Sequence, residues 1–291
     1  MSHRPQLDHV VLAVNDLAAA ADDFRALGFT VTPGGEHRGR SSHNALIVFD
    51  DGAYLELKAW RAPAPDEAWW RTLDAHGDGL VDCALWPASV PAALADAHAR
   101  GLHTLRGPVP GRRARPDGAD VRWETARHDT PDVPFLCADL TPRALRVPEG
   151  AARQHANAAT GVACVQMATH DLAQTARRHQ ALLGTGLSWQ WAGRDGDMAG
   201  LRYRLGGADF ELFGPLALAD QADIAIQLIA IDASPHSAFD AARARLIGHG
   251  EGPFACRLRA AEGTPARVLD PARTHGARLV LGQARACSRY F

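Results

Sequence analysis

The sequence lacks the features that mark membrane, secreted or nucleic-acid-binding proteins. No stretch of the 291 residues approaches the ~20 consecutive apolar residues that a membrane-spanning helix needs. The formal net charge of −2 offers no electrostatic attraction for nucleic acid or an anionic membrane. The N-terminus enters a strand pattern directly, without the apolar region of a signal peptide. We therefore expect a cytoplasmic protein that acts on a small molecule, with no nucleic acid and no membrane as partner.

Sequence motifs of several common chemistries are also absent. The five cysteines are odd in number and lack CxxC spacing, which disfavours a disulfide set or a zinc site and predicts reduced, mostly buried thiols. There is no GxSxG, no GxxxxGK[ST], no HExxH and no Rossmann glycine fingerprint at a first strand-to-helix turn. The densest basic run, "GRRARPDG" from Gly111, is short and is interpreted as a solvated loop.

The first 60 residues predict a βαβββ unit. Residues 7–14 alternate as a strand does, and residues 15–27 carry apolar side chains at helical spacing. Asn15 or Asp16 is the expected N-cap of this helix, and Gly28 its C-terminal stop. Residues 29–35 and 43–57 then supply three strands, the last two joined by a turn at Asp51-Gly52.

The same order of elements starts again at Gly79, at Gly161 and at Asp223, with spacings near 70 residues. A Pro- and Ala-rich linker, residues 141–161, separates the second start from the third. The predicted fold class is α+β, with four tandem βαβββ modules paired into two domains. We expect one domain over residues 1–145 and a second over residues 158–291.

A carboxylate in the middle of a hairpin strand is the most informative residue. Glu56 lies between two leucines in "YLEL", where an unpaired buried charge is costly. In the third module "ADFELFG" places Glu211 at the matching position, while Cys164 takes the place of His9. Because both halves keep the glutamate, a random surface position is a poor explanation.

Tandem βαβββ units, a histidine in the first strand ("LDHVV") and a glutamate in the fourth ("YLEL") resemble the vicinal oxygen chelate superfamily. That superfamily includes glyoxalase I, the extradiol dioxygenases and the bleomycin resistance proteins. The segments "SHNALIVFDDGAYLELKAW", "FLCADLTP" and "HANAATGV" resemble glyoxalase-like domain proteins. The resemblance implies paired units whose curled sheets form a cup, with the helices on the convex side.

Strand alternation places two candidate ligands on the concave face of that cup. Val10, Leu12 and Val14 match the apolar stripe of the helix, so His9 faces the cup, and by the same argument Glu56 does too. The resemblance implies a divalent metal site here. The partner unit then supplies Asp82 and, at the end of its last strand, Asp139, which gives an oxygen-rich set for Mn²⁺, Mg²⁺ or Fe²⁺, with Ni²⁺ and Zn²⁺ as further candidates.

The same alternation gives three candidate substrate contacts: Tyr54 and Trp86, whose parity is inward, and His43 at the mouth of the cup. Core packing of Trp86 and a turn-stabilising role for His43 are the alternatives. In the expected register, Glu56 faces Ile47, which cannot neutralise it. In the third module Glu211 faces Arg202, so the second half is interpreted as a degenerate site held by an ion pair.

Two functions remain open at this point. The first is a metal-dependent glyoxalase-like enzyme, with lyase, isomerase or dioxygenase chemistry on a substrate with vicinal oxygens and with Glu56 as the candidate base. The second is a metal-free binding or resistance protein that uses the same cup. Both a monomer and a homodimer are compatible with tandem modules, since each cup can be completed within one chain.

Overall fold

The computed structural model describes residues 5–184, 189–217 and 236–283. Strands of the first half close into an eight-stranded barrel in the order β1-β4-β3-β2-β6-β7-β8-β5. Their bounds are β1 (Gln6–Ala13), β2 (Thr32–His37), β3 (Ser42–Val48), β4 (Tyr54–Trp60), β5 (Gly79–Trp86), β6 (Arg106–Ala114), β7 (Asp120–Arg127) and β8 (Phe135–Asp139). The fold class is therefore as expected, with the first cup closed into a barrel.

The second half forms a separate seven-stranded sheet in the order β10-β11-β12-β9-β13-β15-β14. Its strands are β9 (Ala159–Ala168), β10 (Trp189–Asp195), β11 (Met198–Leu205), β12 (Ala208–Pro215), β13 (Gly252–Ala260), β14 (Arg267–Val268) and β15 (Arg278–Gly282). The first strand expected from Asp223 lies outside the described residues. In the second sheet β13 lies antiparallel beside β9, as β5 does beside β1 in the barrel. Strand β5 is followed by the helix α3 (Val90–Ala99), whereas β13 is followed by the strand β14.

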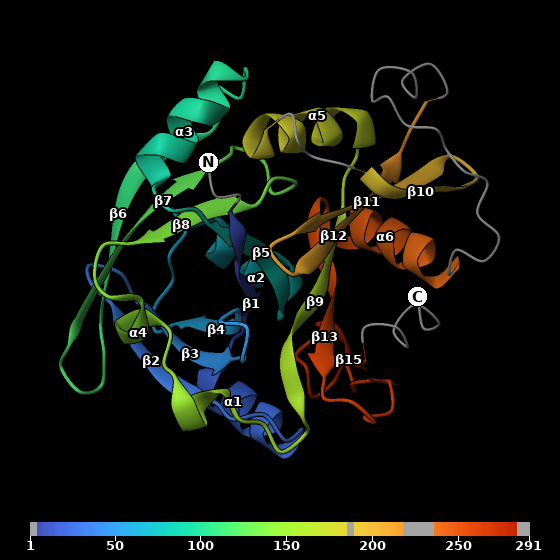
Figure 1. Ribbon diagram of the computed structural model, residues 1–291. Coiled ribbons are helices and arrows are strands. Elements are labelled where there is room, and N and C mark those ends of the chain that lie inside the picture. Colours follow the sequence, from blue (N-terminus) through green and yellow to red (C-terminus); the bar gives the residue numbers. More distant parts are fainter. Residues whose placement is uncertain (1–4, 185–188, 218–235, 284–291) are drawn as a thin grey trace.

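The helices lie outside the sheets (Figure 1). They are α1 (Leu17–Ala26), α2 (Ala68–His76), α3 (Val90–Ala99), α4 (Arg143–Arg146), α5 (Leu172–Leu183) and α6 (His236–His249), with a 3-10 turn, η1 (Gly150–Arg153). Asp16 caps α1 by accepting from the backbone N–H groups of Ala18 and Ala19, and Gly28 follows its end at φ 87°. No helix in the described ranges is long and apolar enough to cross a membrane.

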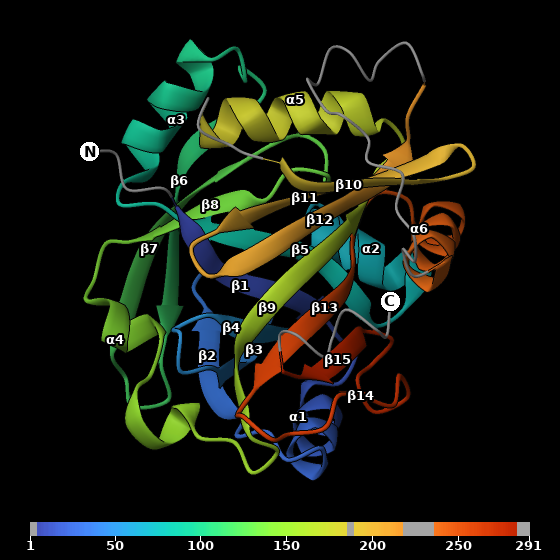
Figure 2. The same ribbon diagram turned by 45° about the vertical axis from the view of Figure 1, so that its right-hand side comes forward.

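One hydrophobic core runs through both halves. It contains Val10 and Leu55 from the barrel together with Val165 and Leu212 from the second sheet. Helices α3 and α5 lie side by side across the boundary (Figures 1 and 2), where Arg100 donates to the carbonyl oxygens of the last turn of α5. The inward and outward faces of β1 and β4 follow the predicted alternation, because residues 10, 12 and 14 share this core with α1.

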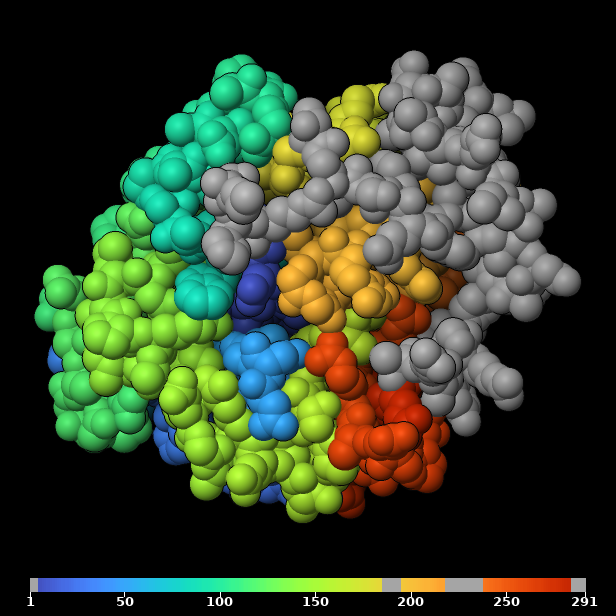
Figure 3. All heavy atoms as spheres, in the orientation of Figure 1, coloured from blue at the N-terminus to red at the C-terminus, as the bar shows by residue number. Residues whose placement is uncertain are grey.

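The segment between the two sheets packs on the first module. His155 accepts from the N–H of Thr30 at Nδ1 and bonds the carbonyl oxygen of Val48 through Nε2, at 3.0 Å each. Asn157 donates to the carbonyl oxygen of Leu27. In the space-filling view this segment covers the lower part of the molecule and ends against the red C-terminal strands (Figure 3). The expected linker is thus an ordered element, and it carries α4.

The β3–β4 hairpin differs from the expected one by a single residue. Phe49 pairs with Ala53 around a three-residue loop, Asp50 to Gly52, in which Gly52 has φ 80°. The expected register, with Ile47 opposite Glu56, is wrong, because Leu46 occupies that position. Since side chains alternate along a strand, this shift by one residue exchanges the two faces of β3.

The basic run from Gly111 also differs from the expectation. Residues 111–114 belong to strand β6, which pairs with β7 and, at two positions, with β2. The interpretation of this run as a solvated loop is wrong for these residues, since Arg113 is only 3% exposed. The pairing of β6 with β2 closes the barrel and brings Arg113 opposite His37.

Candidate functional site

The barrel encloses a cavity of about 600 Å³, within the range of small-molecule sites. Glu56 lies on its wall and is buried. Cations outnumber acids around it: seven Lys and Arg side chains line the cavity against Glu56, Asp66 and Glu67. Aromatic rings supply much of the remaining wall: Tyr54, Trp69, Trp123 and Phe135.

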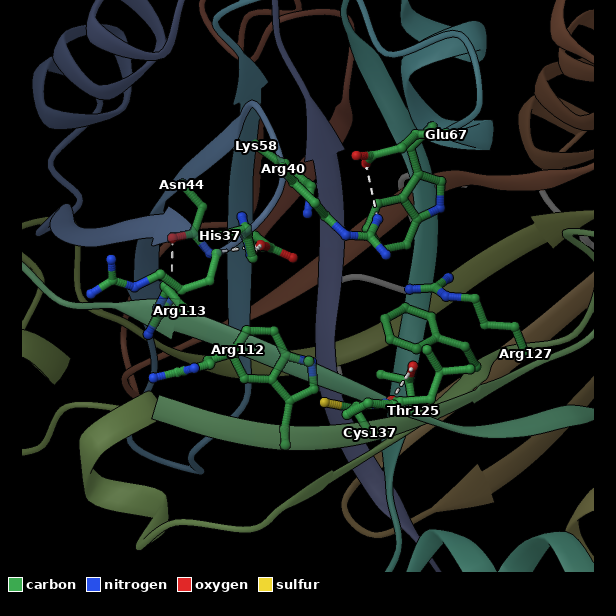
Figure 4. A pocket seen from close by; sticks show the side chains of 18 of the residues that line it. His37, Arg40, Asn44, Lys58, Glu67, Arg112, Arg113, Thr125, Arg127 and Cys137 are labelled. Atoms are coloured by element: carbon green, nitrogen blue, oxygen red, sulfur yellow. Dashed lines mark hydrogen bonds and ion pairs between the residues drawn. The ribbon is translucent and has the colours of Figure 1, made fainter. Parts of the chain in front are cut away.

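Two histidines approach Glu56. His9 on β1 places Nε2 3.5 Å from Oε2 of Glu56, and His37 on β2 places Nε2 3.8 Å from Oε1. Asn44 donates to Oε1 from Nδ2 at 2.6 Å. In Figure 4, His37 and Asn44 lie on the same side of the cavity as Arg113.

Each imidazole is held at its other nitrogen. Nδ1 of His9 bonds Oδ2 of Asp8 at 2.7 Å, and its ring stacks on Tyr54 with 4.6 Å between the ring centroids. Nδ1 of His37 lies 3.2 Å from both the carbonyl oxygen and the hydroxyl of Ser42. A hydrogen bond at Nδ1 fixes the ring and leaves Nε2 directed into the cavity, the arrangement that metal-binding histidines use.

The electrostatics of the cavity keep Glu56 charged and His37 neutral. Burial raises the pKa of Glu56, but the opposite effect of Lys58 and the two histidines is larger, and the resulting pKa is about 2. Burial, reinforced by Lys58, lowers the pKa of His37 to about 3. At neutral pH the site therefore presents a carboxylate and a neutral imidazole.

His9, His37 and Glu56 together offer the donor atoms of a divalent metal site, and their distances can be compared with those of such a site. Two imidazoles and a carboxylate suit first-row metals, and two ligands of a tetrahedral ion lie about 3.4 Å apart. His9 is at that separation from Glu56, while His37 is a few tenths of an ångström beyond it. Across the residues the structure describes, no three His, Cys, Asp or Glu already form a metal group. The three residue types suit such an ion chemically, and their side chains would have to move closer together to bind one.

The structure places Asp82 away from these residues. Its Oδ2 accepts from the indole N–H of Trp69 at 3.0 Å and from Arg127 at 2.9 Å, and both of those side chains line the cavity in front of it. Asp82 itself does not line the cavity. It supports the wall and is not brought together with His9 and Glu56.

Asp139 is likewise engaged elsewhere. It accepts from Nε of Arg146 at 2.5 Å and from Arg143 at 3.1 Å, and these arginines also bind Asp8. The resulting cluster of two carboxylates and two guanidinium groups lies behind Tyr54, whose hydroxyl accepts from Arg146 at 2.7 Å. The structure does not bring Asp139 into a metal group with His9.

Of the three expected substrate contacts, only Tyr54 lines the cavity. His43 pairs with Ala59, so it points to the face opposite Asn44 and Glu56. Trp86 packs under the guanidinium of Arg143, 3.9 Å from its ring centroid, outside the cavity. The one-residue shift in the register of β3 explains why His43 points away from the cavity, since Asn44 takes the inward position expected for His43.

Sequence analysis missed His37, Asn44, Arg113 and Arg146. His37 ends the strand "TPGGEH", in which apolar and polar residues do not alternate, so the sequence did not indicate which face of the sheet its side chain occupies. Arg146 lies in the segment interpreted as a linker. For Asn44 a signal was present, because a three-residue loop ending in Gly52 would have turned it inward.

Among the described residues of the second half, the matching glutamate has different partners. Glu211 accepts from Arg202, from Arg257 at 2.6 Å and from Gln166 at 2.6 Å. Arg202 is its partner across β11 and β12, as predicted. With three donors on the carboxylate and Cys164 in the place of the histidine, this position is an internal ion-pair cluster.

Comparisons with known proteins agree with this fold. The sequence profile described as "Glyoxalase-like domain" matches residues 7–183, and the chain therefore belongs to that family, within the vicinal oxygen chelate superfamily. No curated protein matches the sequence.

Two solved structures share the fold. A hypothetical protein from Staphylococcus aureus is 12% identical, with a TM-score of 0.64 over 95% of this chain and 98% of its own. A mutant of 4-hydroxymandelate synthase from Streptomyces coelicolor is 17% identical, with a TM-score of 0.58 over 90% of this chain and 72% of its own. At these identities the likeness concerns the fold.

Proposed function

We propose that the barrel cavity is the active site of a divalent-metal-dependent enzyme that acts on a small organic molecule with vicinal oxygen atoms. His9, His37 and Glu56 are the proposed ligands of the ion. The observation that supports this most is that two imidazole Nε2 atoms approach one buried carboxylate, each with its Nδ1 held by an acceptor. The proposed domain is the barrel with its flanking helices, within the expected range 1–145, followed by α4.

The proposed set replaces Asp82 and Asp139 by His37 and changes the expected metal. Two imidazoles and one carboxylate suit Fe²⁺, Mn²⁺, Ni²⁺ or Zn²⁺ better than Mg²⁺, which prefers oxygen ligands. When bound, the ion would supply Lewis-acid stabilisation of an oxyanion on the substrate. No proton has to leave Glu56 or His37 before the ion binds, because both are deprotonated at neutral pH.

The other residues would orient the substrate and handle its proton. Asn44 holds Oε1 of Glu56, and Oε2 would accept a proton from a substrate carbon only while it is displaced from the ion. Of the acids in the cavity wall only Glu56 is buried, since Asp66 is exposed and Glu67 half-buried. Lyase or isomerase chemistry through an enediolate, or dioxygenase chemistry, is compatible with this arrangement.

A second candidate function is metal-free binding of a small molecule in the same cavity. The observation that favours it is Lys58, a buried cation beside Glu56 whose charge contributes to the low pKa of that carboxylate. In this alternative, Lys58 neutralises Glu56 permanently and no ion is required.

Metal analysis separates the two functions. The purified protein, expressed with Mn²⁺, Fe²⁺, Ni²⁺ or Zn²⁺, is expected to hold about one equivalent of metal. His9→Ala and His37→Ala are expected to lose it, whereas Glu211→Gln, the matched change in the second half, should retain it. Absence of metal under all four supplements, or full occupancy in both histidine variants, would refute the proposal and favour the binding protein.

A further inference from the structure

Lys58 is a buried ammonium group without an anionic partner in contact. It lies on β4 opposite Asn44, lines the cavity and is 5% exposed. Its Nζ makes no hydrogen bond and no ion pair within 4 Å to any residue of the described chain. It lies 5.8 and 5.1 Å from the ring centroids of Trp60 and Trp69. A buried unpaired charge is costly. A lysine in such a position therefore indicates that a ligand supplies its counter-charge.

Arg113 is the second cation of this kind. It is 3% exposed, its Nη1 donates to Oδ1 of Asn44 at 3.1 Å, and its Nη2 donates to the carbonyl oxygen of Arg146 at 3.3 Å. Its Nε is buried and has no partner, and within the described ranges no carboxylate lies within ion-pair distance. Arg113 is therefore held by neutral acceptors only.

The other buried charges around the cavity balance one another. Arg127 pairs with Asp82, and Arg143 and Arg146 pair with Asp8 and Asp139. Glu56, Lys58 and Arg113 then remain, which leaves one positive charge in excess. Lys58 and Arg113 lie in the same region, because Lys58 pairs with Asn44 across β3 and β4 and Arg113 donates to the side chain of Asn44.

We infer that the natural ligand of the cavity carries a carboxylate that Lys58 and Arg113 recognise. Lys58 offers up to three N–H donors, and Arg113 adds a second positive charge to the same cavity wall. Charge-assisted hydrogen bonds are about twice as strong as neutral ones. Trp69 and Trp123 face the apolar part of the ligand. The inference rests on the cavity being the ligand site, as proposed above, and it holds with or without a metal ion.

Pyruvate and pyruvamide provide a matched pair of probes, since they have the same shape and the same adjacent oxygens but differ in charge. Binding is measured by calorimetry on the full-length protein after treatment with EDTA, so that no metal contributes. Pyruvate is expected to bind at least about tenfold more tightly than pyruvamide. Equal binding of the two, or no binding of pyruvate, would overturn the inference.

Lys58→Met is expected to weaken pyruvate binding by about tenfold or more and to leave pyruvamide binding nearly unchanged. Arg106→Met is the control, because Arg106 lies on the same strand as Arg113, is exposed and pairs with Asp129. Because Lys58 also stabilises the charge of Glu56, the unfolding temperature of Lys58→Met is measured first, and binding is compared at a temperature at which the variant is folded. Unweakened pyruvate binding by a folded Lys58→Met variant would also overturn the inference.

The two proposals fail independently. If the protein holds no metal but distinguishes pyruvate from pyruvamide, the proposed metal-dependent function is wrong and the carboxylate site stands. If metal is bound through His9 and His37 but the probes bind equally, the carboxylate site is wrong and the metal site stands.

Discussion

His9 and Cys164 hold the same position in the two halves of the chain. His9 lies two residues before Val11, which pairs with Glu56, and Cys164 lies two residues before Gln166, which pairs with Glu211. In the first half the imidazole reaches the glutamate, while in the second half Gln166 donates to it. The duplicated glutamate is thus kept in both halves, with different partners.

Replacement of Glu211 by Gln is expected to lower the free energy of unfolding by about 3 kcal/mol at pH 7. The carboxylate is 2% exposed, and its loss leaves two guanidinium groups, those of Arg202 and Arg257, without their common counter-charge. Urea unfolding measures the change. A variant as stable as the unaltered protein would contradict an ion-pair role for Glu211.

The same variant gives a prediction for pH. Burial raises the pKa of Glu211, but Arg257 and Arg202 lower it more, so the folded pKa lies below the ordinary value of 4.5. The stabilisation is therefore complete above about pH 4.5 and is lost as the pH falls through the folded pKa. Unfolding temperatures between pH 2 and 6 should fall less steeply in Glu211→Gln than in the unaltered protein.

Arg146→Lys is expected to destabilise the barrel by about 3 kcal/mol although the charge is kept. Arg146 is 3% exposed. Its Nη1 and Nη2 donate to the two oxygens of Asp8, at 2.6 and 3.0 Å, and its Nε donates to Asp139. A lysine offers one point charge and cannot reach both carboxylates in this geometry. Denaturant unfolding tests this, with Arg106→Lys in an exposed ion pair as the control. Equal stability of the two variants would contradict the prediction.

Gly35→Ala is expected to open the barrel where β2 meets β6. Gly35 has φ 128°, and a Cβ there would lie 1.9 Å from the carbonyl oxygen of Ala114. Gly39→Ala is the matched control, since Gly39 also has positive φ, 74°, but has open space around its Cβ position. The control should cost about 1 kcal/mol of unfolding free energy and Gly35→Ala several times more. Faster hydrogen exchange in β2 and β6 should accompany the larger loss.

Sequence patterns predicted the parts of the fold that depend on local periodicity. The inward direction of His9, Tyr54, Glu56 and Lys58 follows from alternation along β1 and β4 and is confirmed. The α1 boundaries follow from capping residues. The pairing of Glu211 with Arg202 follows from the two-residue turn at Gly206-Gly207.

The parts that could not be predicted depend on loop length and on contacts between distant strands. "DDG" fits both a two-residue and a three-residue loop, and the choice decides whether Asn44 or His43 meets Glu56. Arg113 is buried only because β6 pairs with β2, a contact between residues more than 70 positions apart. Composition made this run look solvated, since arginine is usually exposed unless paired.

The seam between β2 and β6 consists of two residue pairs, Glu36 with Ala114 and His37 with Arg113. The cavity is therefore completed only where two βαβββ units meet, because one unit brings His9, His37 and Glu56, and the segment from β6 to α4 brings Arg113 and Arg146. Both walls of the cavity therefore belong to one polypeptide but to different units, so that the imidazoles of one wall and the guanidinium groups of the other can be altered independently by mutation.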